Sequence, residues 1–371
     1  MKVECVKEKL RAAIGHAERV TGKNLSLPLL GSILIETRAK TLFIRATNLD
    51  IGVELELPAK IIEQGKVAVS GAFMNNFLGL VQEGDVLKME TVNDNLALAT
   101  RSSSSVLKCL PSDEFPTLPH LQETDSMLLP AAKLVAGLRS VAYGASLSDM
   151  KPEISSVYLY EQDGELIFVA TDSFRLGEKR YELKDTGERA EPVAVIIPLK
   201  NVLELIRIFD SCSDVLFVQY TKSQISFTAA QAGIYVTSRL VGGVFPNYQQ
   251  IVSAQKKTEV VLAKKELLQA LKLATVFTDK FNQVTFKVVP SEGLCEVSSR
   301  NGDTGETTTR LDATVEGEEL AISFNNKYIL DCLSSISEDT LSLAFNGASK
   351  PMTIRGMGDA SFFYLVMPLN R

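Results

Sequence analysis

Three aspartates stand where carboxylate chemistry is often found, directly after an apolar run that predicts a strand. They are Asp50, Asp172 and Asp303. A catalytic or metal-binding carboxylate needs a base, a nucleophile or further ligands beside it. The sequence places no such group near any of the three, so we expect each of them to cap a turn.

Metal-binding and nucleophilic motifs are equally scarce. The chain has two histidines and five scattered cysteines, none in a Cys-x-x-Cys pair, which predicts free thiols and no zinc site. It also lacks a P-loop, a dinucleotide-binding glycine motif, HExxH and GxSxG. We therefore predict a protein without cofactor, metal or catalytic residues. An enzyme of unrecognised type is one alternative.

Basic side chains gather on the predicted helices. A periodicity of 3.6 residues predicts helices over 7–20, 71–82, 130–142, 198–209, 263–275 and 325–336. Together they carry a net charge of +7, against −6 for the whole chain, which leaves −13 for the strands and loops. Solvated helix faces would explain one such helix. Four of the six are basic, however, which favours a protein that meets phosphates on one side only.

An internal repeat of about one third of the chain predicts the domain organisation. A strand ending in a polar turn, an extended step into a helix, and a strand leaving a hairpin recur in the same order. Their ranges are 42–50, 166–176 and 294–303; 67–80, 193–206 and 320–333; and 106–118, 236–248 and 362–370. We predict three homologous α+β domains over 1–121, 122–253 and 254–371, each with two helices packed on antiparallel sheet.

The helices of two such chains could surround a DNA duplex. Twelve helices side by side at about 9–10 Å spacing form a circle roughly 36 Å across their axes. Subtracting one helix diameter of about 10 Å leaves a hole of roughly 26 Å. That hole accepts a B-form duplex about 20 Å wide without any entry into its grooves.

Eight segments, in order and with matching spacing, carry a resemblance to a known family. They are 27–36, 46–54, 110–118, 169–176, 196–207, 238–248, 324–333 and 364–371. Over essentially its whole length the chain resembles the β subunit of bacterial DNA polymerase III, the sliding clamp. The resemblance implies three DNA-clamp domains per chain and a head-to-tail homodimer that forms a six-domain ring. The seam would lie between Leu107 in the first domain and Val276 and Phe277 in the third.

The resemblance also implies partners that insert short linear peptides between the second and third domains. These would be the DNA polymerase III α subunit, the clamp loader, other DNA polymerases, mismatch-repair proteins and ligase. The corresponding positions are Ile154, Thr171, Ser173, Phe174, Arg175, Leu176, Pro246, Ile251, Phe281, Asn325, Tyr328, Pro351, Leu365, Val366, Met367, Pro368 and Leu369. The residue types agree, since an adaptable methionine suits a site that accepts several peptides.

The remaining partner is duplex DNA, bound without regard to sequence. We expect eight basic residues to face it: Lys23, Lys133, Arg139, Lys151, Lys200, Arg207, Lys264 and Lys272. No apolar run is long enough to span a membrane, and the charged first twenty residues predict no signal peptide, so we expect a cytoplasmic protein without membrane contact. An oligomeric scaffold that does not encircle DNA is the second alternative.

Overall fold

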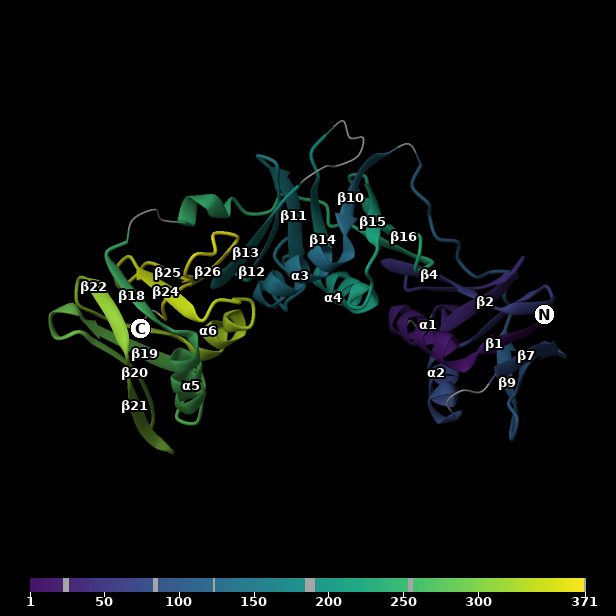
Figure 1. Ribbon diagram of the computed structural model, residues 1–371, viewed down its shortest axis with the longest axis horizontal. Coiled ribbons are helices and arrows are strands. Elements are labelled where there is room, and N and C mark those ends of the chain that lie inside the picture. Colours follow the sequence, from purple (N-terminus) through teal and green to yellow (C-terminus); the bar gives the residue numbers. More distant parts are fainter. Residues whose placement is uncertain (23–26, 83–85, 123, 184–190, 253–255, 370–371) are drawn as a thin grey trace. The chain divides into compact units, whose positions relative to one another are not determined.

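The computed structural model describes residues 1–22, 27–82, 86–122, 124–183, 191–252 and 256–369 of the protein (Figure 1). The chain forms two compact units. The first holds residues 1–135, 185–191 and 200–240, and the second holds 136–184, 192–199 and 241–371. None of the described helices is long and apolar enough to cross a membrane.

The described residues form six α-helices, one for each predicted helix. They are α1 (Lys7–Val20), α2 (Gly71–Leu80), α3 (Ala131–Val141), α4 (Leu199–Phe209), α5 (Lys264–Thr275) and α6 (Asn326–Leu333). Short 3-10 helices span Pro28–Gly31, Ala142–Gly144, Tyr248–Ile251 and Pro290–Glu292. Side chains cap two of the α-helices: Ser70 before α2 and Asn325 before α6 accept hydrogen bonds from first-turn N–H groups. The boundaries agree with the prediction within a few residues.

The first unit is built on one antiparallel sheet of thirteen strands. In spatial order the strands are β10 (Asp125–Pro130), β15 (Val215–Tyr220), β16 (Gln224–Ala229), β17 (Ile234–Arg239), β4 (Ile51–Pro58), β3 (Thr41–Thr47), β2 (Ser32–Arg38), β6 (Lys66–Ser70), β9 (Ser104–Leu110), β8 (Asn95–Ala99), β7 (Val86–Val92), β1 (Lys2–Val6) and β5 (Lys60–Glu63). Helix α1 packs against α2 and against β3 and β4. Its buried face includes Leu10 and Ile14, four residues apart, as an amphipathic helix requires.

The second unit contains two antiparallel sheets. The nine-stranded sheet has the order β14 (Ala194–Pro198), β11 (Ser156–Gln162), β12 (Glu165–Thr171), β13 (Arg175–Glu182), β26 (Phe362–Val366), β25 (Met352–Gly356), β24 (Thr340–Phe345), β18 (Thr258–Ala263) and β22 (Ala313–Gly317). The four-stranded sheet has the order β21 (Gly305–Leu311), β20 (Leu294–Asn301), β19 (Gln283–Val289) and β23 (Leu320–Asn325). Buried Phe286, Phe324 and Phe345 meet in its core, together with Leu271 of α5 and Ile329 of α6. The predicted α+β class is confirmed.

Strands β9 and β21 are among the strands with an edge that no described strand pairs along its full length. Strand β9 pairs with β8 from Ser104 to Lys108, but its other side meets β6 only at Cys109 and Leu110. Strand β21 is the last strand of the four-stranded sheet. Open edges of this kind are available for pairing with another chain.

Two helical glycines should respond to alanine in opposite directions. A Cβ at Gly137 in α3 would lie 2.6 Å from the Phe168 ring, whereas a Cβ at Gly15 in α1 would meet nothing within 4 Å. Gly137→Ala should destabilise the protein by about 1–3 kcal/mol through overpacking. Gly15→Ala should stabilise it by about 0.5–1 kcal/mol, because alanine restricts the unfolded chain and favours helix. Urea unfolding followed by circular dichroism measures both, and shifts of the same sign would contradict the packing described for Gly137.

Candidate functional site

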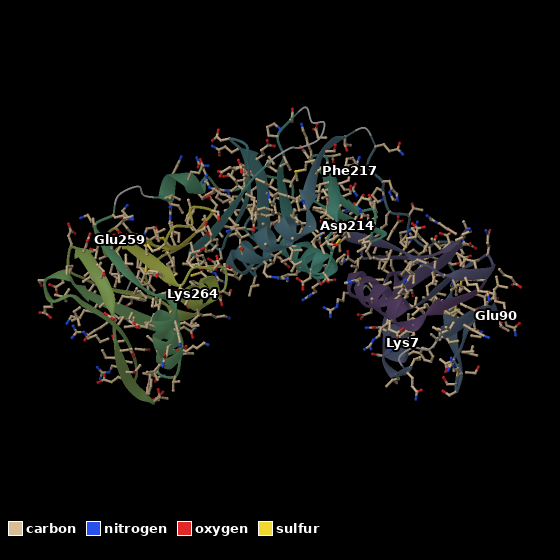
Figure 2. The ribbon with its side chains drawn as sticks, in the orientation of Figure 1. Lys7, Glu90, Asp214, Phe217, Glu259 and Lys264 are labelled. Carbon is tan, nitrogen blue, oxygen red and sulfur yellow. The ribbon has the colours of Figure 1, made fainter. Side chains whose placement is uncertain are left out.

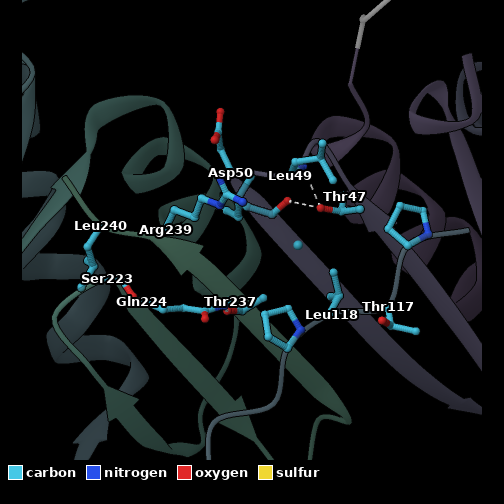
Figure 3. A pocket seen from close by; sticks show the side chains of 14 residues that line it. Thr47, Leu49, Asp50, Thr117, Leu118, Ser223, Gln224, Thr237, Arg239 and Leu240 are labelled. Carbon is cyan, nitrogen blue, oxygen red and sulfur yellow. Dashed lines mark hydrogen bonds between the residues drawn. The ribbon is translucent and has the colours of Figure 1, made fainter. Parts of the chain in front are cut away.

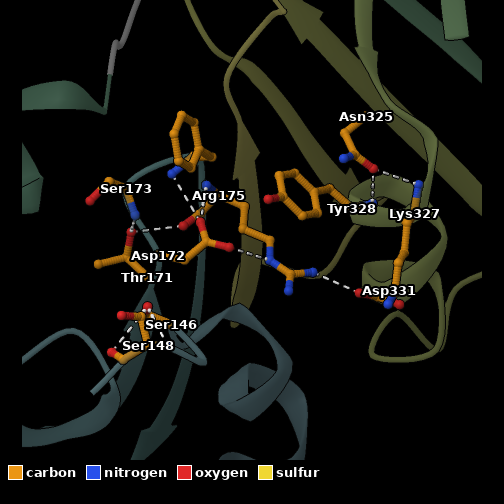
Figure 4. A network of polar contacts seen from close by, with 11 residues as sticks. Ser146, Ser148, Thr171, Asp172, Ser173, Arg175, Asn325, Lys327, Tyr328 and Asp331 are labelled. Atoms are coloured by element: carbon orange, nitrogen blue, oxygen red, sulfur yellow. Dashed lines mark hydrogen bonds and ion pairs between the residues drawn. The ribbon is translucent and has the colours of Figure 1, made fainter. Parts of the chain in front are cut away.

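The turn between β12 and β13 is fixed by its own side chains (Figure 4). The Asp172 carboxylate accepts hydrogen bonds from the backbone N–H groups of Phe174 and Arg175, at 2.9 and 3.0 Å. The Thr171 hydroxyl donates to the Arg175 carbonyl at 2.7 Å and accepts from the Ser173 N–H at 3.1 Å. Ser173 takes a left-handed conformation with φ of +78°. The predicted capping role of Asp172 is confirmed.

At the other two predicted turns the capping residue is different. Asn48 accepts hydrogen bonds from the N–H groups of Asp50 and Ile51, both at 2.9 Å. Asn301 accepts one from Asp303, also at 2.9 Å. The prediction was wrong for Asp50 and Asp303 because the capping side chain precedes them by two residues. Their own side chains are exposed.

Arg175 at the start of β13 holds the second and third thirds of the chain together. Its guanidinium pairs through Nε with Asp172, at 3.0 Å, and through Nη1 with Asp331 of α6, at 2.6 Å. It also lies 4.3 Å from the centre of the Tyr328 ring. The side chain is only 10% exposed. Burial lowers the pKa of Arg175, but the hydrogen bond to Asp331 and the charge of Asp172 outweigh this effect, so that its pKa lies above the ordinary value and it stays charged.

Apolar side chains lie next to this network because β13 pairs with β26. Arg175 stands opposite Val366 and Leu176 opposite Leu365, and all three of these apolar side chains are buried. The Met367 N–H donates to the Phe174 carbonyl at 2.7 Å. Beyond the end of β26 the chain becomes more accessible, since Met367 and Leu369 are half-buried. Phe174, in the turn between β12 and β13, is 61% exposed.

The structure connects most of the predicted peptide-binding residues. We call Thr171, Phe174, Arg175, Tyr328, Met367 and Leu369 the Arg175 surface. Ser173 belongs to its turn, Asn325 caps the helix that carries Tyr328, and buried Pro368 lies between Met367 and Leu369. Pro351, Pro246 and Phe281 are attached to it through neighbours. Pro351 precedes Met352, which stands opposite Val366. Pro246 follows Phe245, which belongs to the buried cluster against which Met367 packs. Phe281 precedes Asn282, whose carbonyl accepts a hydrogen bond from the Asn326 N–H.

Two predicted residues are not joined to the Arg175 surface by any hydrogen bond or ion pair of the described chain. Ile154 is buried, and its backbone bonds to Lys151 and Ser146. Ile251 is 49% exposed at the end of a 3-10 helix. Conversely, Asp331 was missed by the prediction. Its position three residues after Tyr328, on the same face of α6, was the signal that could have found it.

The basic residues predicted to face DNA differ in their surroundings; of these, Figure 2 labels Lys264. Arg139, Lys151, Lys200, Arg207 and Lys272 are exposed, and Lys133 is half-buried. Lys264 donates from its ammonium group to the Ile336 carbonyl at 2.6 Å. Lys23 lies outside the described residues.

A cleft of about 800 Å³ in the first unit has four basic residues in its lining. Helices α1, α2 and α4 supply the lining, together with the residue that follows α4. The lining residues are Lys7, Glu8, Arg11, Ala12, Gly15, His16, Glu18, Arg19, Asn75, Arg207 and Asp210. Burial, followed by the charge of Arg19, lowers the pKa of His16, so this side chain adds no charge at neutral pH. Lys7 is 2% exposed and is therefore part of the core.

The residues predicted for the dimer seam lie at the open edges of β9 and β21. Leu107 is half-buried in the middle of β9. Val276, which follows α5, is 65% exposed. The Phe277 ring lies 3.7 Å from the place of a Cβ on Gly305, the first residue of β21. The seam residues of the third domain therefore stand beside its open edge.

Comparison with known proteins gives the family. Three family models match consecutive parts of the chain: the N-terminal, central and C-terminal domains of the DNA polymerase III beta subunit, at residues 1–119, 128–247 and 249–370. The beta sliding clamps of Synechocystis sp. and Bacillus subtilis are both 27% identical to the chain, with 100% of the chain and 99% and 100% of those proteins covered.

Solved structures agree over the whole chain. The DNA polymerase sliding clamp of Bacillus subtilis superposes with a TM-score of 0.93 at 26% identity and covers 100% of this chain and 99% of its own. A sliding clamp of Pseudomonas aeruginosa bound to griselimycin has a TM-score of 0.93 at 20% identity, with 100% of both chains covered, and so shows the fold.

Three repeated α+β domains and whole-chain likeness to sliding clamps define a DNA-clamp protein. The chain belongs to the family of bacterial DNA polymerase III beta subunits, the beta sliding clamps, and functions as a DNA sliding clamp. The three predicted domains are confirmed, while the boundaries at 121 and 253 stay a prediction. The two compact units divide the central domain, since β13 joins the sheet of β26 and β17 joins that of β4.

Removal of the buried guanidinium should weaken the fold. Arg175→Ala removes the cation that the carboxylates of Asp172 and Asp331 share. The side chains of these two aspartates are only 13% and 28% exposed, so water can solvate them only in part. We expect a loss of about 2–4 kcal/mol in the free energy of unfolding. Lys327→Ala, which removes an exposed charge from α6, the helix that carries Asp331, is the matched control. It should change stability by less than about 0.5 kcal/mol. Equal stability of the two variants in urea would rule out a structural role for the Arg175 network.

Proposed function

We propose that the chain forms a head-to-tail homodimer, closed as a six-domain ring around duplex DNA, and tethers replication proteins to that DNA without catalysing a reaction. The observation that carries the ring is that β9 in the N-terminal domain and β21 in the C-terminal domain each have an open edge at which predicted seam residues lie. Its place would be the cytoplasm, where bacterial DNA is replicated. The domains would divide at 121 and 253.

Pairing of β9 with β21 of a second copy would satisfy both edges at once. Each strand has seven residues, and their backbone N–H and C=O groups would form an antiparallel ladder. Val106, which is 65% exposed on β9, and Val276 beside β21 supply apolar surface for the same contact. A head-to-tail interface of this kind closes into a ring when the rotation allows it.

The exposed basic residues of the helices would face the duplex. Arg139 lies on α3, Lys200 and Arg207 on α4, and Lys272 on α5. Contacts between such side chains and phosphates carry no sequence information, which suits a ring that must move along DNA. We assign the same role to Lys23, Lys133, Lys151 and Lys264.

The Arg175 surface would bind linear peptides of the partners. Partner classes are the DNA polymerase III α subunit, the clamp loader, other DNA polymerases, mismatch-repair proteins and ligase. Phe174 and Met367 supply apolar contact area, and the paired Arg175 fixes the turn that presents it. A rigid surface lowers the entropic cost of binding a flexible peptide. The griselimycin-bound relative supports a ligand site on a clamp of this fold.

The ring predicts that a charge at the seam separates the copies. Leu107→Glu, or Val276→Asp together with Phe277→Asp, should give a folded monomer, because the buried carboxylates would lack partners. The same variants should no longer be retained on nicked circular DNA. Val92→Glu, at an exposed strand position outside the seam, is the control. A dimer of either seam variant in sedimentation velocity would place the seam elsewhere.

Removing basic residues should weaken contact with every DNA sequence alike. In a variant with Lys133, Arg139, Lys200, Arg207, Lys264 and Lys272 changed to Ala, each lost phosphate contact should flatten the slope of log K against log salt by about 0.9. Binding to two short duplexes of unrelated sequence measures this. Lys40, Lys287 and Lys350, exposed on strands and loops, provide the control variants. A loss confined to one sequence would contradict sliding.

Truncation of one apolar anchor should reduce peptide binding. Met367→Ala should weaken a labelled Gln-Leu-Ser-Leu-Phe peptide about tenfold, since an anchor side chain contributes about 1.5–3 kcal/mol when fully buried. Met357→Ala changes a methionine that is 48% exposed at another site and should leave the affinity unchanged. Anisotropy titration gives both constants, and equal affinities of the two variants would move the peptide site away from Met367.

A further inference from the structure

A second turn of the chain repeats the hydrogen bonds of the Arg175 surface. In the β3–β4 turn, the Thr47 hydroxyl donates to the Ile51 carbonyl at 2.9 Å and accepts from the Leu49 N–H at 2.9 Å. Asn48 accepts from the N–H groups of Asp50 and Ile51, as Asp172 does in the β12–β13 turn. Leu49 has φ of +76°, where Ser173 has +78°.

The strand that follows each turn is paired in the same register. Ile51 stands opposite Ser238 of β17, as Arg175 stands opposite Val366 of β26. The Arg239 N–H donates to the Asp50 carbonyl at 2.8 Å, as the Met367 N–H does to Phe174. The backbone geometry of the Arg175 surface is therefore present a second time, in the first unit.

This second turn borders a cavity of about 490 Å³ (Figure 3), which we call the Arg239 cavity. Its lining includes Leu49, Asp50, Pro116, Pro119, Ser223 and Arg239. Its size lies within the range of pockets that hold small ligands. Leu49 is 45% exposed, and with Pro116 and Pro119 it gives the lining an apolar part.

The side chains differ from those of the Arg175 surface in a way that predicts a different ligand. Arg239 replaces Met367, and Ile51, which is 2% exposed, replaces the paired Arg175. No side chain among the described residues forms an ion pair or hydrogen bond with the exposed guanidinium of Arg239. In Figure 3 the Asp50 carboxylate points away from the other lining side chains. The cavity thus offers one accessible cation next to apolar surface.

We propose that the Arg239 cavity is a second peptide-binding site of the chain, which takes a linear segment with a carboxylate beside an aliphatic or aromatic side chain. The Arg239 guanidinium pairs with the carboxylate, in a bidentate contact where the geometry allows it. Leu49 and the two prolines receive the neighbouring apolar side chain. The choice of a peptide as ligand rests on the proposed function of the Arg175 surface. The presence of the cavity and of the exposed Arg239 guanidinium in its lining does not depend on that function.

The test is a selection in which the first site is occupied. A phage library of random heptapeptides is selected on the wild-type protein with excess Gln-Leu-Ser-Leu-Phe peptide, and is counter-selected on Arg239→Glu. We expect enrichment of sequences with Asp or Glu beside Leu or Phe. Labelled copies of these peptides should bind Arg239→Gln and Ser223→Trp about tenfold more weakly, since a charge-assisted contact or the cavity volume is lost.

Matched variants separate this site from the first. Lys222→Gln removes an exposed charge beside the cavity that does not line it, and it should leave the affinity of the selected peptides unchanged, as should Met367→Ala. Failure to enrich any acidic sequence, or unchanged affinity in Arg239→Gln, would overturn the second site. Peptides lost through Met367→Ala alone would also reject it while supporting the Arg175 surface. If Met367→Ala leaves Gln-Leu-Ser-Leu-Phe binding unchanged, it is instead the proposed function that fails.

Discussion

Strand edges have to be paired, and this requirement organises the chain. An uncovered row of backbone N–H and C=O groups invites pairing with whatever strand is near. The protein meets the requirement internally at two places, where β4 pairs with β17 and β13 pairs with β26. Strands of the central domain thereby complete the sheets of both neighbouring domains. Strands β9 and β21 keep open edges, and pairing of these two edges between copies is the assembly that we propose.

Pairing register also fixes the chemistry of the Arg175 surface. Arg175 is the first residue of β13, and its position opposite Val366 decides which face of the sheet its side chain occupies. A slip of one residue would turn the guanidinium away from Asp331 and Tyr328. The β12–β13 turn and the pairing register together hold the buried guanidinium of Arg175 in place. Because Phe174 belongs to this turn, its exposed side chain is held in a fixed position as well. The surface that we propose for peptide binding is thus built on a rigid base.

The sequence predicted local features well and long-range ones poorly. The six helices followed from the periodicity of apolar residues within short stretches of sequence. The three α+β domains followed from the internal repeat. Pairing between strands far apart in the chain leaves no such record. At the site, Asp172 was predicted to cap its turn from residue type, but Asp331 was missed because its role depends on which helix face meets β13. Counts of charge located basic helices, yet they could not show that Lys7 is buried or that Lys264 bonds to a carbonyl.

The late position of β26 in the chain has a consequence for biosynthesis. Val366 leaves the ribosome about 190 residues after its partner Arg175, which at about 5–20 residues per second is a delay of roughly 10–40 s. During that time β13 has an open edge, and the nascent chain cannot complete its nine-stranded sheet. Contacts between residues so distant in sequence also slow folding after release. The interval exposes unfinished chains to mispairing with one another on the same polysome, a hazard that chaperone binding to the nascent edge would relieve.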